Sequence, residues 1–202
     1  LASSWFWPDL AKDVKAYVEG CAACARKDDK PQPAAPLGGA DVRRVSQLHS
    51  ADLMGPLPEG PAGEKYLLVV CDAVSKRRAL MALPNKEAAT VARAIEWAWC
   101  ACFPSPPDVL LSDNGGEFVG EPMRVLCSDF NVEHRTTSPR HAAGNGQVER
   151  NNRTIARALR PYLSPAQREW PLLLPHLMSS LNSAVVAKAA SASSALGITV
   201  MV

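Results

Sequence analysis

Three acidic residues of the chain could act together on a divalent metal ion. Asp52 lies near the end of an apolar stretch, Asp113 follows the short apolar run 109–112, and 35 residues separate it from Glu149. Carboxylate oxygens suit ions such as Mg²⁺, which completes its shell with water and phosphate. Two such ions about 3.5–4 Å apart can activate the attacking oxygen and stabilise the leaving oxygen when a phosphodiester is cut. With 20 acidic residues in the chain, three ordinary surface charges are the alternative.

The stretch 145–160, which contains Glu149, predicts an amphipathic helix. At 3.6 residues per turn, one face is apolar and is expected to pack on the protein: Val148, Ile155, Leu159 and, just beyond the stretch, Tyr162. The other face carries Glu149 with four arginines: Arg150, Arg153, Arg157 and Arg160. A merely solvated face, which is the alternative, usually mixes its charges as i, i+4 pairs. The segregation therefore indicates an anionic partner.

The sequence between residues 45 and 182 predicts the elements that would hold these acids. Strands are expected at 45–54, 66–70, 79–83, 109–112 and 132–137, and helices at 87–102, 122–130, 145–160 and from Ser164 onward. The first three strands should be antiparallel, whereas the tight strand–helix–strand unit 109–137 makes its two strands parallel. This order fits an α/β fold with a mixed five-stranded sheet and helices on both faces. Asp52 and Asp113 would then lie near strand ends, where open sheets collect ligands.

Residues 1–30 predict a short helical segment that ends in the pair Cys21 and Cys24. Two cysteines at this spacing can be half of a zinc site, but no histidine occurs before His49 to complete it. Two thiols without metal are an equal alternative, and a redox pair is less favoured because no strand precedes it. Residues 31–44 are expected to be a linker, since residues 30–40 are rich in proline and glycine.

Composition limits the classes of protein that need to be considered. The 202 residues, 47% of them hydrophobic, suffice for one domain with a small appendage. A net charge of +2 means that any attraction to phosphate is local. Several of the six cysteines lie in apolar runs, and no apolar stretch of membrane-spanning length or leader is present. We therefore expect an intracellular protein without disulfides or a membrane partner, and a fragment, because it begins at Leu1. The Ala/Ser-rich tail 183–202 gives no functional prediction.

The sequence motifs around the acids resemble those of a known family. Asp52 lies in ADLMGPLP, Asp72 in VVCDAVSK, Asp113 in SDNGGEF and Glu149 in GNGQVERNNRT. In this order and spacing, residues 45–182 resemble the D,D-35-E catalytic core of retroviral and gypsy-like long-terminal-repeat retrotransposon integrases, which has a ribonuclease-H-like fold. Residues 1–30 resemble the end of the family's His-His-Cys-Cys zinc domain, whose two histidines would lie before Leu1.

The resemblance implies an activity and roles for particular residues. Asp52, Asp113 and Glu149 would bind Mg²⁺ or Mn²⁺, hydrolyse a phosphodiester at a DNA end and join the new 3′-hydroxyl to target DNA. Zinc would bind Cys21 and Cys24 only if the upstream histidines are present. The residues that would approach DNA are His141, Asn145, Gly146, Gln147, Arg150, Arg153 and Arg157.

The resemblance also implies partners and leaves one alternative. The partners would be the element's DNA ends, target DNA and further copies of the chain, as a homodimer or higher oligomer, in the nucleus or a retrotransposon particle. The chain departs from the family at Ala142 and Ala143, where Pro-Gln is usual, and lacks the usual Ser-Thr-Gly-x-Ser-Pro stretch after Asn182. A degenerate or domesticated domain that binds DNA without catalysis is therefore the alternative.

Overall fold

The computed structural model describes residues 7–20, 42–136, 152–163 and 168–195. A helix, α1 (Leu10–Gly20), precedes an α/β unit in which residues 152–159 are also helical. The other elements follow in chain order: β1 (Leu48–Met54), β2 (Tyr66–Asp72), β3 (Arg78–Leu83), α3 (Ala88–Ala101), β4 (Val109–Ser112), α4 (Gly116–Val119), α5 (Glu121–Asp129), β5 (Glu133–Thr136), the 3₁₀ turn η1 (Arg160–Tyr162) and α7 (Trp170–Ala195).

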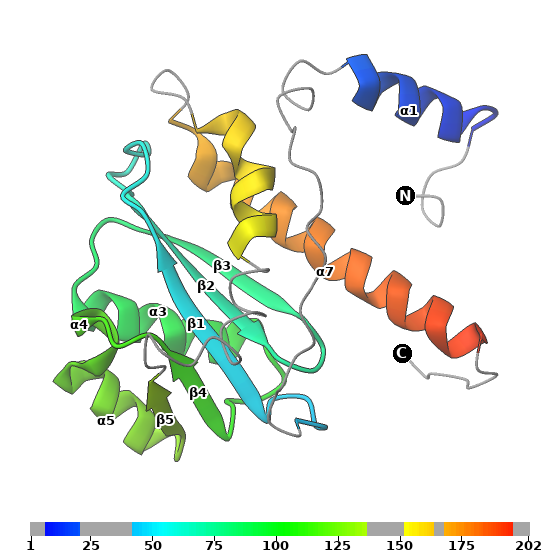
Figure 1. The fold of residues 1–202 in the computed structure, drawn as a ribbon. Helices are drawn as coiled ribbons and strands as arrows, with labels where there is room; N and C mark the ends of the chain where they lie inside the picture. Colours follow the sequence, from blue (N-terminus) through cyan, green and yellow to red (C-terminus); the bar gives the residue numbers. More distant parts are fainter. Residues whose placement is uncertain (1–6, 21–41, 137–151, 164–167, 196–202) are drawn as a thin grey trace.

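The five strands form one mixed sheet, as predicted. Their order across the sheet is β3-β2-β1-β4-β5 (Figure 1). β1, β2 and β3 pair antiparallel, whereas β4 pairs parallel with both β1 and β5. β1 thus lies at the centre of the sheet and joins its antiparallel part to its parallel part.

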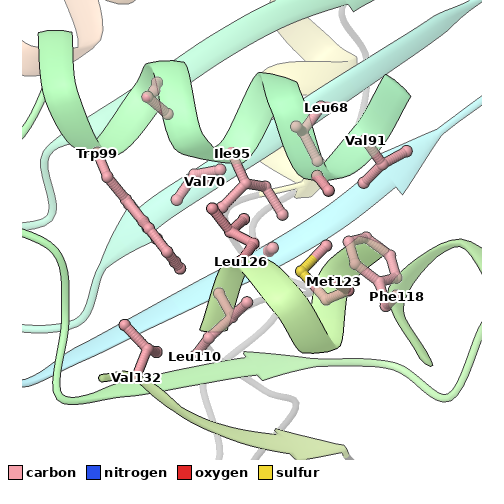
Figure 2. Close-up of a cluster of buried hydrophobic side chains, with 14 of the residues drawn as sticks. Leu68, Val70, Val91, Ile95, Trp99, Leu110, Phe118, Met123, Leu126 and Val132 are labelled. Atoms are coloured by element: carbon pink, nitrogen blue, oxygen red, sulfur yellow. The ribbon is translucent and has the colours of Figure 1, made fainter. Parts of the chain in front are cut away.

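The two faces of the sheet are covered by different helices. On one face, Leu68, Val70 and Leu110 pack with α3, α4 and α5 around Trp99 and Phe118 (Figure 2). On the other face, the alternate residues of the strands pack with the helix 152–159 and α7: Leu67, Val69, Leu80, Ile155, Leu159, Trp170 and Leu174. The side-chain alternation of each strand therefore feeds two separate cores.

The chain after residue 159 differs from the prediction. Tyr162 was expected on the packed face of a helix, but it is 42% exposed. The cause is local, because Pro161 lies in the 3₁₀ turn η1, which changes the direction of the side chains that follow. The next helix was expected from Ser164, but residues 168 and 169 are not helical and α7 begins at Trp170.

Helix α7 begins at a buried tryptophan and extends into the C-terminal tail. Trp170 is fully buried, and its indole Nε1 donates a hydrogen bond of 2.6 Å to the carbonyl of Pro58. Pro171 is tolerated because the first turn of a helix needs no backbone donor. The helix then runs to Ala195, so most of the Ala/Ser-rich tail is helical. None of the helices in the described ranges is long and apolar enough to span a membrane.

A buried histidine lies where β1 and β2 pair. His49 stands opposite Asp72, packs its ring on Phe103 at 4.2 Å between centroids, and has its Nε2 3.8 Å from an Asp72 oxygen. Asp72 accepts hydrogen bonds from the backbone N–H groups of Ser46 and Ser75 and from the Ser75 hydroxyl. Burial lowers the pKa of His49 to about 4, although the Asp72 carboxylate acts in the opposite direction. His49 is therefore neutral in the folded protein at physiological pH.

We predict that the free energy of unfolding falls as the pH is lowered from about 7 to 5. The unfolded chain binds a proton at His49 near its ordinary pKa of 6.5, which the folded protein excludes down to about 4. This difference amounts to roughly 2 kcal/mol between pH 7 and pH 5. Urea unfolding measures it, and His49→Leu, which keeps an apolar contact with Phe103, should show a smaller fall. An equal fall in both proteins would contradict the assignment.

Candidate active site

The parallel pairing of β1 with β4 brings two of the predicted acids together. Leu48 pairs with Val109 and Ser50 with Leu111, so paired residues differ by 61 in number. The same offset carries Asp52 to Asp113, directly beyond the end of β4. Level residues of neighbouring strands point to the same face and lie about 4.8 Å apart. Asp52 and Asp113 are therefore neighbours near the carboxyl ends of β1 and β4.

Asp52 is a partly buried carboxylate with two donors and two acidic neighbours. One of its oxygens accepts a hydrogen bond of 2.8 Å from the backbone N–H of Leu53, and the other accepts one from the amide Nδ2 of Asn152. Burial raises the pKa of Asp52 most, and the nearby Asp113 and Glu117 carboxylates raise it further, whereas the two hydrogen bonds lower it. The net shift is upward, so ionised Asp52 is disfavoured in the protein without metal.

The turn after β4 holds Asp113 and a further acid, Glu117. The backbone N–H of Gly115 donates a hydrogen bond of 3.0 Å to Oδ1 of Asp113. A Cβ atom on Gly115 would lie 3.0 Å from this oxygen and 2.9 Å from Oε2 of Glu117, which is in the first turn of α4. Glycine at this position thus leaves room for two carboxylates. Glu117 was not among the residues predicted for the site, although it is part of SDNGGEF.

Asn152 was also missed, and it connects Asp52 to the helix 152–159. The helix is fixed on the sheet by Ile155 and Leu159, which are fully buried or nearly so. Besides donating to Asp52, Asn152 has a buried Oδ1 without a hydrogen-bond partner in the described part of the protein. Its position three residues after Glu149 was the available signal, because residues i and i+3 share a helix face.

The other predicted residues divide into two groups. Of the arginines in the described ranges, Arg153 is exposed and Arg157 is half-buried with polar interactions of its own. The rest lie outside the described residues: Cys21, Cys24, His141, Asn145, Gly146, Gln147, Glu149 and Arg150.

The donor set fits a hard divalent cation. Asp52, Asp113 and Glu117 supply only oxygen atoms, and a bound cation would offset the burial and the repulsion that raise the pKa of Asp52. The Oδ1 of Asn152, which has no hydrogen-bond partner in the described part of the protein, adds a buried acceptor next to Asp52. Within the described ranges no group of three His, Cys, Asp or Glu side chains, these three acids included, is placed to hold a metal ion. The expected third ligand, Glu149, is outside those ranges.

Comparison with known proteins gives the family. Residues 43–142 match the family model described as integrase core domain. Residues 43–142 are an integrase core domain. The matched range contains Asp52 and Asp113 and all five strands of the sheet. The predicted resemblance to integrases is confirmed.

Curated relatives of this integrase core domain are parts of much longer polyproteins. The retrovirus-related Pol polyprotein from transposon 412 of Drosophila melanogaster is 25% identical over 181 residues, covering 89% of this chain and 14% of the relative. The Pro-Pol polyprotein of feline foamy virus is 24% identical over 184 residues, covering 91% and 16%. The transposon Tf2-3 polyprotein of Schizosaccharomyces pombe is 26% identical over 182 residues, covering 89% and 14%. The chain thus spans about one seventh of the relatives it matches.

Solved structures confirm the fold of the integrase core domain. The catalytic core domain of BIV integrase superposes with a TM-score of 0.53 at 22% identity, covering 67% of this chain and 82% of that one. A chain of the simian T-cell lymphotropic virus intasome in complex with PP2A regulatory subunit B56 gamma gives a TM-score of 0.58 at 17% identity, covering 85% and 59%. The predicted ribonuclease-H-like sheet is therefore confirmed.

We predict that Asp52→Asn raises the melting temperature of the protein in EDTA at neutral pH. The ionised carboxylate is disfavoured by burial and by Asp113 and Glu117, and the amide removes that charge. Differential scanning calorimetry measures the shift. Asp108→Asn is the control, because Asp108 is ion-paired with Arg44 and its neutralisation should not stabilise. A lower melting temperature for Asp52→Asn would contradict the electrostatic description.

Proposed function

We propose that this chain is the catalytic core of a gypsy-like retrotransposon integrase that cuts and joins DNA with Mg²⁺ or Mn²⁺. The observation that carries the proposal is the placement of Asp52 level with Asp113 by the β1–β4 register, with Asn152 bonded to Asp52. Glu149, three residues before Asn152 in the sequence, would supply the third carboxylate. The family model and the transposon relatives support the same activity.

The proposed reaction consists of two displacements at phosphorus. Water first cuts a phosphodiester near a DNA end and leaves a 3′-hydroxyl. That hydroxyl then attacks a phosphodiester of the target, so one P–O bond forms as another breaks and the target's 3′-oxygen leaves. Bound metal ions would activate the attacking oxygen and stabilise the leaving oxygen.

The residues of the chain would orient these groups. Asp52, Asp113 and Glu149 would hold the ions. Asn152 would fix the Asp52 carboxylate through its amide, and the N–H of Gly115 would fix that of Asp113. Both contacts are present without metal, which supports the proposal that these two carboxylates are held ready to bind it.

DNA would lie along the arginine face of the helix that carries Asn152. Arg153 is the next residue and is exposed, so its guanidinium can reach a phosphate close to Asp52. Such contacts position the duplex without reading its sequence. The residues proposed to continue this surface are His141, Asn145, Gly146, Gln147, Arg150 and Arg157.

The partners and domain limits follow the same proposal. One structural neighbour is a chain of an intasome, and we propose that this chain likewise works as a homodimer or higher oligomer on element ends and target DNA. Residues 1–30 would end a zinc domain only if upstream histidines are present to complete it. Residues 31–44 would link this segment to the core 45–182, and 183–202 has no proposed role. The expected setting is the nucleus or a retrotransposon particle.

We predict that the protein performs strand transfer on a branched DNA substrate with Mn²⁺, and that Asp113→Asn loses at least about 100-fold of the rate because a metal ligand is lost. Gel analysis of labelled product measures this. Equal activity in both proteins would refute the proposal. DNA binding that persists in EDTA without product would instead favour the DNA-binding alternative.

We predict that Arg153→Glu weakens DNA binding about tenfold at low salt and lowers the salt slope by about 1, because a phosphate contact is lost. Fluorescence anisotropy across a salt series measures both quantities. The matched control is Arg93→Glu, an exposed arginine on α3, on the opposite face of the sheet. Its affinity should change little. Equal weakening by both variants would show a general charge effect and remove Arg153 from the proposed surface.

A further inference from the structure

A buried hydroxyl connects the backbone of Asp113 to the neighbouring strand. Ser112, the last residue of β4, is 3% exposed. Its Oγ lies 2.8 Å from the carbonyl oxygen of Asp113 and 2.9 Å from Nε2 of His134. His134 is in β5, where it pairs with Leu110, two residues before Ser112. Ser112 and His134 are thus diagonal neighbours on one face of the sheet.

The chemistry of the three groups fixes the direction of both hydrogen bonds. A serine hydroxyl has one hydrogen, and the Asp113 carbonyl can only accept, so Oγ donates to that carbonyl. Oγ must then accept from His134, which requires a hydrogen on Nε2. Burial lowers the pKa of His134, so its ring is neutral at pH 7 and its Nδ1 carries no hydrogen.

These two hydrogen bonds act on Asp113, which lies just beyond the end of β4. β4 ends at Ser112, and Asp113 is exposed, so neither a strand ladder nor packing orients it. Two contacts remain in the described structure: the Gly115 N–H on its carboxylate and the Ser112 hydroxyl on its carbonyl. Loss of the second contact would let the peptide plane after Asp113 rotate, and the carboxylate would move away from Asp52.

Ser112 and His134 lie on the opposite face of the sheet from the proposed metal site. Leu110 and Val132 belong to the core under α3 and α5, and strand alternation puts Ser112 and His134 on that side. Asp52 instead shares its face with Met54, which packs against the other core. His134 therefore touches neither the proposed metal ions nor DNA at the proposed site, and any effect on them passes through Ser112.

We propose that His134, through Ser112, is a positioning residue that holds Asp113 in the geometry for binding metal. Its catalytic consequence rests on the proposed function, whereas the hydrogen-bond chain itself does not. The requirement is a hydrogen-bond donor at the position of Nε2, because the accepting Oγ of Ser112 needs a hydrogen from residue 134. Glutamine can present an amide N–H at a similar distance from the backbone, and leucine cannot.

The first test reads the tautomer in protein without metal. Long-range ¹H–¹⁵N NMR spectra at neutral pH should show His134 with its hydrogen on Nε2, and Ser112→Ala should shift that Nε2 signal. A ring with its hydrogen on Nδ1, or a signal unchanged in Ser112→Ala, would overturn the inference. Neither result depends on enzymatic activity.

The second test measures the dissociation constant of Mn²⁺ by calorimetry. His134→Leu and Ser112→Ala should each weaken binding about tenfold, the magnitude typical of groups that orient a metal ligand. His134→Gln should restore most of the affinity, and the double variant should be no worse than either single one, because both break one chain. Unchanged affinity in His134→Leu, or equal loss in His134→Leu and His134→Gln at similar melting temperatures, would overturn the inference.

The controls separate this inference from the proposed function. Asp113→Asn should abolish Mn²⁺ binding in the same assay. If it does while His134→Leu binds normally, only the positioning role fails. If the unmodified protein binds no Mn²⁺, the proposed function fails. The tautomer measurement alone then decides whether His134 donates to Ser112. If His134→Leu does not fold, Ser112→Ala and His134→Gln supply the comparison.

Discussion

The register between β1 and β4 is the constraint on which the candidate site depends. It joins segments 61 residues apart and places Asp52 level with Asp113. A slip of one residue would turn the second carboxylate to the opposite face, because side chains alternate along a strand. β1 is held from its other side by six residue pairs with β2, which leaves it little freedom to slip. The central strand of the sheet thus sets the geometry of the acids.

The two cores support different parts of the candidate site. Ser112 and His134 lie on the same face of the sheet as the core under α3 and α5, and we propose that they hold the turn after β4. The other core fixes the helix 152–159 through Ile155 and Leu159, so that Asn152 reaches Asp52. Between them lies Asp52, whose charged form is disfavoured first by burial and then by repulsion from the Asp113 and Glu117 carboxylates. The two cores supply the stability that tolerates this repulsion, as expected of a site built to receive cations.

Sequence reasoning predicted the sheet and the two neighbouring acids, because apolar runs and family motifs are local signals. It missed the four-residue α4, which is too short to show helical periodicity, and it misplaced Tyr162, because Pro161 turns the chain into η1. Asn152 and His134 act through partners 100 and 22 residues away, and only the folded sheet reveals such pairs. The role of Glu149 stays a prediction, since it lies outside the described residues.

The central claim is that Asp52 and Asp113 together hold a divalent ion. Anomalous diffraction from crystals of the protein soaked in Mn²⁺ tests it most directly, because the signal locates the ion without reference to activity. We predict a peak about 2.0–2.3 Å from a carboxylate oxygen of each residue, and its absence in crystals of Asp113→Asn. Soaked crystals in which no ion bridges the two carboxylates, or in which Mn²⁺ binds only elsewhere, would contradict the claim.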